Sequence, residues 1–265
     1  RDLVRSRGLG DVYKRQLLAR KKERDRRGLF VVEGPKMFGE APMERIERVY
    51  LAQSAAAQMY EKYGDRLSGL SCETVSDEVF VKMSDTKTPQ GILCLVRQQH
   101  YNIEEILREN KEKQMLFIIL EDIQDPGNLG TIFRTAEAAG ADGVIMSSWT
   151  ADIYNPKTIR STMGSVYRVP FFHVDQMEEA VRRLQKAGVA VYAAHLGGTA
   201  AYDACDYQKS TAFLIGNEAK GLREETAACA DARITIPMAG KVESLNAAVA
   251  SSILLFEAAR QRRKG

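Results

Sequence analysis

The second half of the chain alternates short apolar runs with stretches of helical periodicity. Residues 115–120 form a continuous apolar run, which is typical of a strand buried on both faces of a parallel sheet. The same criteria predict further strands at 143–146, 189–193, 212–215 and 234–236, and helices at 131–139, 176–186 and 245–260. Strands and helices that alternate in this order predict an α/β domain whose parallel sheet is covered by helices.

The first half of the chain predicts a smaller α/β unit. A basic helical stretch precedes the first of its expected strands, which lie at 29–32, 49–51 and 92–96. Ser54 is placed to cap the helix that follows the second strand. Further short elements are expected around Val75, Phe80 and Met83.

These patterns divide the chain into two domains, 17–97 and 115–265. The segment between them, 98–114, is polar and charged and is interpreted as a linker, partly helical through Ile103, Ile106 and Leu107. Residues 1–16 have no amphipathic repeat, so we interpret them as a non-native or disordered leader.

The composition is that of a soluble globular protein, with 45% hydrophobic and 28% charged residues among 265. No run is long and apolar enough to cross a bilayer and no secretory segment opens the chain, so we expect a cytoplasmic protein without membrane contact. The four cysteines and three histidines are scattered, which predicts reduced thiols and no metal site.

The charge of the chain is unevenly distributed. Residues 1–30 hold eleven basic and four acidic residues, although the net charge of the whole chain is only +3. Such a basic stretch suits contact with phosphates, and the alternative is a solvated helix face.

Unusual residues follow three of the predicted strands of the second half. The first group spans 121–130 and contains a Pro-Gly-Asn-Leu-Gly turn at 126–130, with a helix expected to start directly after it. Arg134 would then lie near the N-terminus of that helix, where a cation opposes the helix dipole. This placement favours a functional use of Arg134, and the alternative is a solvated surface arginine.

The second group lies at 214–222, and the third consists of 234–240 and 244–250. Glycines flank Asn217-Glu218 just past a strand, and glycine allows a close approach of the backbone to a ligand. In the third group, Ser244 is placed to cap the closing helix and Asn246 falls in its first turn. Because ligands bind beyond the carboxyl ends of parallel strands, we expect the three groups to form one site.

Taken together and in this order, the three groups resemble the signature motifs of the SpoU/TrmH family of RNA ribose methyltransferases, in the SPOUT superfamily. The resemblance covers about 17–265. In the first half, the strings at 29–34 and 84–91 also resemble the family's ribosomal-protein-like RNA-binding domain.

The resemblance implies a fold, a cofactor and partners. It implies an α/β C-terminal SPOUT domain with a deep trefoil knot, a homodimer formed through the knot domain, and a site shared between subunits. S-adenosylmethionine would be bound mainly by backbone groups, with cofactor contacts at Gly216, Ile236 and Leu245 and with Asn217 and Met238 nearby.

The resemblance also implies catalytic roles at five positions. In the family, the arginine that matches Arg134 is proposed to activate the 2′-hydroxyl. Because a free arginine keeps its proton to above about pH 12, we expect Arg134 instead to stabilise the developing alkoxide and orient the phosphate or ribose. Asn128 would hydrogen-bond the ribose, and Glu218 would fix Arg134 or the ribose. Ser244 and Asn246 would shape the pocket.

Several alternatives remain open at this point. A nucleotide-dependent oxidoreductase would need the full G-x-G-x-x-G spacing, which the sequence lacks around Gly127 and Gly130. A base-methylating SPOUT enzyme and a non-catalytic RNA-binding protein are the others. Ribosomal RNA is the first expected substrate and transfer RNA the second.

Overall fold

The computed structural model describes residue 10 and residues 18–263, so the expected leader at 1–16 lies outside the described residues except for Gly10. The chain forms two compact units. One comprises the described residues up to His100 together with Asp152–Tyr167, and the other comprises Tyr101–Ala151 and the residues from Arg168 onward.

The C-terminal unit is built on a seven-stranded sheet with the order β7-β6-β5-β10-β8-β11-β9, in which every pairing is parallel. The sheet confirms the predicted α/β class. Its strands are β5 (Leu116–Leu120), β6 (Gly143–Ser147), β7 (Phe171–Val174), β8 (Ala190–Ala194), β9 (Ala200–Ala201), β10 (Thr211–Ile215) and β11 (Ala232–Thr235). The trefoil knot stays a prediction from the resemblance.

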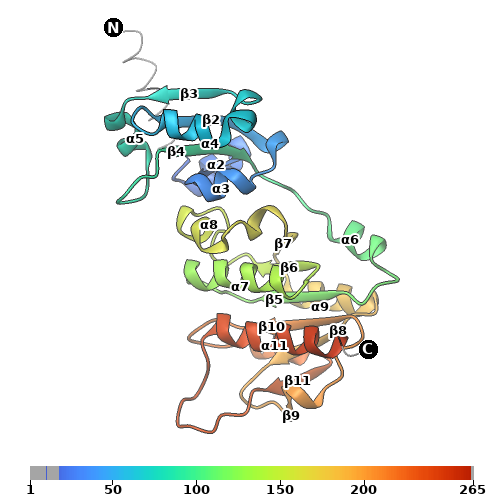
Figure 1. The fold of residues 1–265 in the computed structure, drawn as a ribbon. Helices are drawn as coiled ribbons and strands as arrows, with labels where there is room; N and C mark the ends of the chain where they lie inside the picture. The colour runs from blue at the N-terminus through green and yellow to red at the C-terminus, as the bar shows by residue number, and fades with distance from the viewer. Residues whose placement is uncertain (1–9, 11–17, 264–265) are drawn as a thin grey trace. The chain divides into compact units, whose positions relative to one another are not determined.

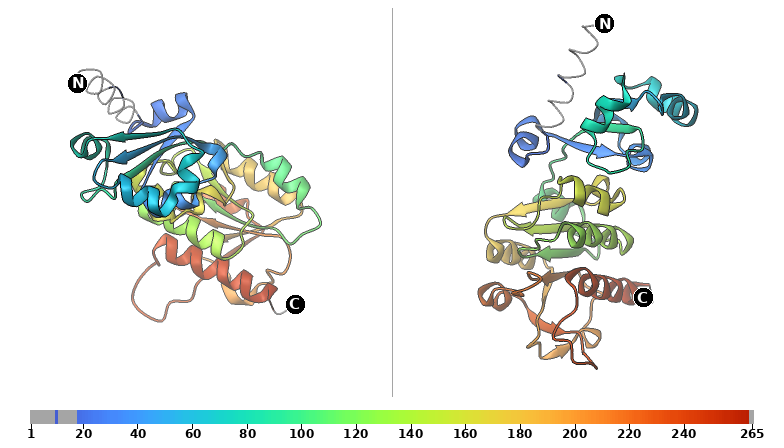
Figure 2. Two further views of the ribbon diagram at one scale, coloured as in Figure 1. Left: turned by 45° about the horizontal axis from the view of Figure 1, so that its top comes forward. Right: turned by 90° about the vertical axis from the view of Figure 1, so that its left-hand side faces the viewer.

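Helices cover both faces of this sheet (Figures 1 and 2). One face packs against α6 (Ile103–Glu109), α9 (Met177–Lys186) and α10 (Glu224–Ala228) in a continuous apolar core. On the other face α7 (Pro126–Ala138) contacts β6 and α11 (Ala247–Arg262) contacts β10, and the two helices pack against each other. Successive side chains of each buried strand point to opposite faces of the sheet and therefore pack against different helices.

The expected linker is partly wrong. Tyr101 packs edge-on against Phe171, with ring centroids 5.4 Å apart, and Ile103 and Ile106 pack against the core of the C-terminal unit. This segment is therefore part of the unit, because its apolar residues face the core once α6 has formed.

The N-terminal unit has a four-stranded mixed sheet with the order β1-β4-β2-β3. Only the β2–β3 pair is parallel. The strands are β1 (Leu29–Glu33), β2 (Ile46–Ala52), β3 (Cys72–Val75) and β4 (Ile92–Arg97). The helices are α2 (Lys21–Arg27), α3 (Pro35–Glu40), α4 (Ala56–Ser68), α5 (Asp77–Met83) and α8 (Pro156–Thr162). Short 3-10 turns lie at Met43–Arg45, Ser165–Tyr167 and Tyr202–Ala204.

The helix after β2 begins differently from the prediction. Its N-cap position is Ala55, and no side chain caps it. The Ser54 hydroxyl instead donates to Asp77 Oδ1 at 2.8 Å and so ties this turn to α5.

The segment Asp152–Tyr167 belongs to the N-terminal unit although its sequence lies between β6 and β7 of the other unit. The guanidinium of Arg24 donates to Asp152, and the rings of Tyr154 and Phe30 lie 4.5 Å apart. The Tyr167 hydroxyl donates to the Met37 carbonyl at 3.0 Å. The expected continuous domain over 115–265 therefore does not coincide with one compact unit.

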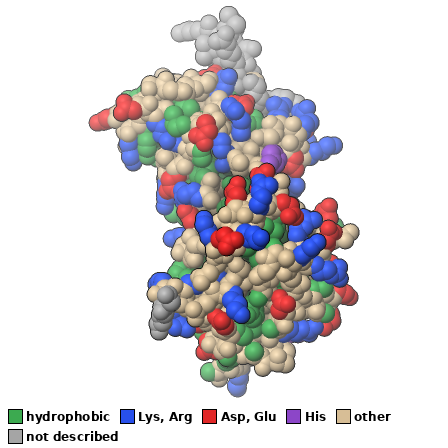
Figure 3. All heavy atoms as spheres, turned by 90° about the vertical axis from the view of Figure 1, so that its right-hand side faces the viewer, with side chains coloured by type: hydrophobic (Ala, Val, Ile, Leu, Met, Phe, Trp, Pro, Cys, Tyr) green, Lys and Arg blue, Asp and Glu red, His purple; other side chains and the backbone are tan. Residues whose placement is uncertain are grey.

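Among the described residues, no helix is long and apolar enough to cross a membrane. Figure 3 shows that basic and acidic side chains are interspersed on the face it draws. Charge on that face is thus mixed in sign, in keeping with the small net charge of +3.

Candidate active site

A cavity of about 310 Å³ lies beyond the carboxyl ends of β8, β10 and β11. Its wall includes the loop after β10, the loop after β11 and the residues that lead into α11. All five positions predicted for the cofactor line it, and so do two of the predicted catalytic residues: Gly216, Asn217, Ile236, Met238 and Leu245, with Glu218 and Ser244.

The loop after β10 is held in a tight shape by Asn217. Its Nδ2 donates to the Asp122 carbonyl at 2.7 Å, and its Oδ1 accepts the backbone N–H groups of Ala219 and Lys220, each at 3.0 Å. The backbones of Asn217 and Gly221 are also paired. A Cβ at position 216 would lie 2.2 Å from the Gly221 carbonyl carbon, so this close approach requires glycine.

A chain of hydrogen bonds joins the three motif groups. The Glu218 carboxylate accepts the N–H groups of Gln124 and Asp125, the latter at 3.0 Å, and it also accepts Nδ2 of Asn128 at 3.2 Å. Oδ1 of Asn128 accepts Nδ2 of Asn246 at 2.9 Å. Three loops that are far apart in sequence are thereby fixed to one another.

These contacts set the ionisation of Glu218. Partial burial raises the pKa of this carboxyl, but the N–H donors of Asp125 and Gln124 and the amide of Asn128 outweigh it and hold the pKa below its usual range. Glu218 is therefore a fixed anion at the edge of the cavity. Glu218 forms its hydrogen bonds with the 124–128 turn, and among the described residues it forms none with Arg134, which it was predicted to fix.

Asn246, and not Ser244, caps the closing helix. Asn246 Oδ1 accepts the N–H groups of Ala248 at 2.8 Å and Val249 at 3.3 Å. The helix α11 begins later than predicted because an asparagine oxygen satisfies its first free N–H groups. Ser244 instead lies in the preceding loop and lines the cavity.

The placement of Arg134 also differs from the prediction. The helix α7 begins at Pro126, and Asp125 Oδ1 caps it by accepting the Asn128 N–H at 2.7 Å. The Pro-Gly-Asn sequence is thus the first helical turn, since proline is well suited to that position. Arg134 consequently lies in the second half of α7, where a cation does not oppose the helix dipole. The prediction that Arg134 lies near the N-terminus of the helix was therefore wrong.

Arg134 is exposed and does not line the cavity. The next residue, Thr135, shares a hydrogen bond of 3.2 Å with Ser252 of α11. Arg134 is therefore placed beside the α7–α11 contact.

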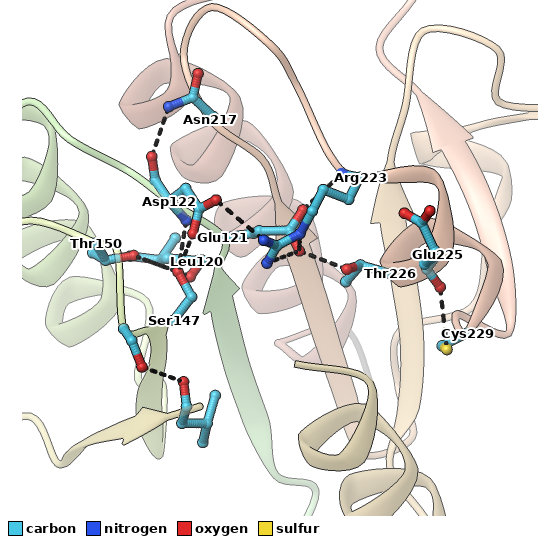
Figure 4. Close-up of polar contacts among 12 residues, drawn as sticks. Leu120, Glu121, Asp122, Ser147, Thr150, Asn217, Arg223, Glu225, Thr226 and Cys229 are labelled. Atoms are coloured by element: carbon cyan, nitrogen blue, oxygen red, sulfur yellow. Dashed lines mark hydrogen bonds and ion pairs between the residues drawn. The ribbon is translucent and has the colours of Figure 1, made fainter. Parts of the chain in front are cut away.

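The first group also contains a buried carboxylate, Glu121, to which the sequence assigned no role (Figure 4). Glu121, 1% exposed, accepts the backbone N–H of Arg223 at 2.7 Å and its Nε at 3.0 Å, together with the Thr226 hydroxyl. Burial lowers the pKa of Arg223, but the charge of Glu121 more than reverses this, so the pKa is raised. The pair anchors the end of the 216–222 loop to β5. The sequence feature that could have indicated this role is the acidic pair Glu121-Asp122, directly after a fully apolar strand.

The sequence reasoning also missed one wall of the cavity. Ala194, His195 and Leu196 follow β8 and line it, and Leu196 is 70% exposed. A Cβ at Gly198 would lie 2.5 Å from the Ile234 carbonyl carbon, so the turn after β8 packs tightly on β11. The Gly197-Gly198 pair after a predicted strand was the signal for this fourth turn.

The residues of the cavity fit S-adenosylmethionine. Leu196, Ile236 and Leu245 give an apolar wall for an adenine ring, as small-molecule sites usually provide. Glu218 and Glu243 place carboxylates in a cavity that would receive a cationic sulfonium and ammonium group. The other polar residues that line the cavity are His195, Asn217, Lys220, Thr235 and Ser244.

Comparison with known proteins identifies the family. Residues 115–256 match the SpoU rRNA Methylase family model, and residues 12–94 match the MRM3-like substrate binding domain. A 23S rRNA (guanosine(2553)-2′-O)-methyltransferase of Bacillus subtilis (strain 168), RlmP, is 32% identical over 238 residues. That match covers 89% of this chain and 90% of the relative.

Solved structures of similar proteins support the same relationship. The SpoU methyltransferase AviRb from Streptomyces viridochromogenes in complex with AdoMet has a TM-score of 0.84 at 27% identity, covering 95% of this chain and 97% of its own. An AdoMet-bound rRNA methyltransferase from Sinorhizobium meliloti has a TM-score of 0.78 at 35% identity, covering 94% of each chain.

Proposed function

The chain belongs to the SpoU rRNA Methylase family, and from this premise we propose how its residues carry out the reaction. It is an S-adenosylmethionine-dependent RNA 2′-O-ribose methyltransferase that acts on ribosomal RNA. The observation that carries this function is the convergence of all five expected cofactor residues on one cavity, tied by Glu218 to the turn that holds Asn128.

The cofactor, when bound, supplies an electrophilic methyl group to the acceptor oxygen. The task of the chain is to hold the ribose in line with that methyl at about 3 Å and to accommodate the charge that develops on the 2′-oxygen. Arg134 provides a permanent cation for that charge, because its guanidinium does not lose its proton near neutral pH.

Asn128 is placed to orient the ribose. One N–H of its amide donates to Glu218 and one lone pair of its oxygen accepts Asn246. A second N–H and a second lone pair remain for the ribose hydroxyls. Glu218 and Asn246 act through Asn128 as positioning residues, and Ser244 shapes the cavity wall.

The active form is a homodimer in which α7 and α11 form the contact and Arg134 completes the site of the partner subunit. Two observations support this proposal. Arg134 lies on α7 beside α11 but outside the cavity of its own chain. Val249 and Phe256 are 47% and 45% exposed on α11. They are separated by about two helical turns and so share one face.

The substrate assignment follows the named relatives, which include 23S rRNA 2′-O-methyltransferases. We assign RNA binding to the domain at 17–97 and methyl transfer to the domain at 115–265. The segment 98–114 connects them in sequence, and its residues from Tyr101 onward pack with the C-terminal unit. A substrate in the ribosome implies a cytoplasmic location.

The test is transfer of a tritiated methyl group from S-adenosylmethionine to ribosomal RNA from a strain lacking the gene, followed by nucleoside mapping. A 2′-O-methyl nucleoside in 23S RNA is the expected product. Methylated bases without 2′-O-methyl nucleosides would overturn the ribose assignment, and product in transfer RNA alone would move the substrate to that class.

A further inference from the structure

Two sequence strings of the N-terminal unit are not explained by the methyl-transfer site, and the structure brings them together. The Glu33 carboxylate accepts the hydroxyls of Ser84 and Thr86, the latter at 2.7 Å, and the backbone N–H of Asp85 at 3.2 Å. Gly34 donates its N–H to the Ile92 carbonyl at 3.0 Å. The strings at 29–34 and 84–91 therefore form one fixed structure.

A pocket of about 290 Å³ lies against this structure. Its wall comes from 33–37, from 86–90 and from the end of α8 at 160–163, all within the N-terminal unit. Gly34 has a φ of +98°, and a Cβ there would lie 2.6 Å from Gln90 Oε1, so glycine lets the Gln90 amide approach the wall.

Two cationic side chains line the pocket. Lys36 and Arg160 both line it and both are exposed. Within the part of the chain that the structure describes, neither side chain makes a hydrogen bond or an ion pair. A guanidinium beside an ammonium is well suited to bind a phosphate group.

The opposite side of the pocket suits a nucleobase. Glu33 accepts three hydrogen bonds, and an ionised carboxylate has about four acceptor sites, so one remains for an N–H of a base edge. Met37 and Met163 supply apolar, polarizable surface for a ring.

The backbone at Met163 is itself unusual. Met163 has a φ of +52° at the C-cap of α8, a position where glycine is the usual residue. A side chain is thus kept at the mouth of the pocket although it disfavours that backbone conformation.

We infer that this pocket binds one unpaired nucleotide of the RNA substrate, with its phosphate on Lys36 and Arg160 and its base toward Glu33 and Gln90. The inference rests on the proposed RNA substrate and makes the pocket a second recognition point, separate from the methylated ribose. Recognition of an unpaired base is the usual way in which proteins read RNA sequence.

The test compares the double variant Lys36→Gln/Arg160→Gln with the matched control Lys62→Gln/Lys82→Gln, whose residues are exposed on helices of the same unit outside the pocket. The probe is 23S RNA from a strain lacking the gene. We expect the KM for RNA to rise about tenfold in the pocket variant, with kcat and the Kd for S-adenosylmethionine unchanged. Filter binding without cofactor should show a salt slope smaller by about 0.7, since Lys36 and Arg160 share one phosphate and each phosphate contact on a single strand contributes about 0.7.

A second measurement identifies the contact directly. RNA that carries 4-thiouridine is crosslinked to the wild-type protein, and the attached peptides are mapped. Crosslinks to 33–37, 86–90 or 160–163 are expected. The conservative variant Lys36→Arg/Arg160→Lys should recover most of the affinity, which a variant that misfolds would not do.

The outcomes separate this inference from the proposed function. A pocket variant that matches the control in KM and salt slope, with no crosslink to the three segments, overturns the inference while methylation stands. Loss of RNA binding in the pocket variant, in a protein that methylates no RNA, would keep the inference and overturn the function. If the pocket bound inorganic phosphate but the pocket variant bound RNA with unchanged affinity, the inference would also be overturned.

Discussion

At the scale of single residues, the site depends on polar side chains that fix one another before any ligand binds. Asn217 shapes its own loop with three hydrogen bonds, and Asn128 stands between Glu218 and Asn246. Such a fixed arrangement favours catalysis because its dipoles need little reorganisation during the reaction. Arg134 is the exception, since it is exposed and lies outside this network.

Replacing Arg134 should therefore separate turnover from folding and cofactor binding. We expect Arg134→Ala to lower kcat by at least about a hundredfold, the usual loss when one group facing a developing oxyanion is removed. The melting temperature and the Kd for S-adenosylmethionine should stay at wild-type values, because the side chain has no partner within the described chain. Calorimetric titration and single-turnover kinetics check this, with Arg134→Lys as the control that keeps the charge. Wild-type turnover in Arg134→Ala would refute the role.

Glu218 gives a prediction with a definite pH dependence. Its pKa is lowered in the folded state, so its charged form stabilises the fold above the ordinary glutamate pKa, and this stabilisation is lost as the pH falls through the lowered value. Glu218→Gln should melt about 2–4 °C below the wild type near neutral pH. The gap should begin to close below about pH 4.3. Thermal melts of both proteins from pH 3 to 8 test this, and a gap that is independent of pH would contradict it.

At this scale, the residues that line the cavity could be predicted better than the hydrogen bonds between them. Gly216, Asn217 and Leu245 were assigned to the cofactor from sequence, and they line the cavity. The contact of Glu218 with Asn128 was not predicted, because a contact between residues about ninety positions apart depends on how two loops fold and leaves no local pattern.

At the scale of elements, five of the seven strands of the C-terminal sheet were predicted, β7 and β9 were not, and the helix ends were predicted poorly. A buried parallel strand has a long apolar run, as at 115–120. Helix ends depend on single capping side chains, and both Asp125 and Asn246 were overlooked as caps. The short helices α8 and α10 were missed because one or two turns give too few apolar positions for a period.

The capping role of Asn246 can be separated from its bond to Asn128. Asn246→Ala removes both and should cost about 1 kcal/mol, or about 2–4 °C in melting temperature. Asn246→Asp keeps an oxygen for the helix N–H groups but has no N–H to donate to Asn128. It should therefore melt within about 1 °C of the wild type and still lose kcat. Calorimetry and steady-state kinetics on both variants check this. Equal kcat in Asn246→Asp and the wild type would show that the bond to Asn128 has no catalytic role.

At the scale of the whole molecule, sequence order and spatial grouping disagree. Residues 152–167 lie within the methyltransferase part of the sequence, yet they pack with the N-terminal unit through Tyr154 and Tyr167. Periodicity reports whether a segment is buried but not against which unit it packs, so this could not be predicted. The proposed site shared between two subunits is likewise a property of two chains, and we propose that a partner subunit covers Val249 and Phe256, which are exposed in the single chain.

Mixing two inactive variants tests the shared site directly. Arg134→Ala lacks the catalytic cation but keeps its cofactor cavity. Gly216→Ala would place a Cβ 2.2 Å from the Gly221 backbone and should abolish cofactor binding while keeping Arg134. In a mixed dimer of two-fold symmetry, one of the two sites receives an intact cavity from one subunit and an intact Arg134 from the other.

Random reassociation of the two variants makes about half of the dimers mixed, so about a quarter of the wild-type activity should return. Each variant should be inactive alone, and Val249→Lys/Phe256→Lys introduced into both should prevent dimerisation, as measured by analytical ultracentrifugation, and abolish the recovery. If Arg134 served the cavity of its own chain, no mixed dimer could contain a complete site, since each subunit lacks one essential part. Absence of recovery in dimers shown to exchange subunits would therefore place Arg134 in its own subunit's site, whereas activity that returns with subunit exchange requires a site built from two chains.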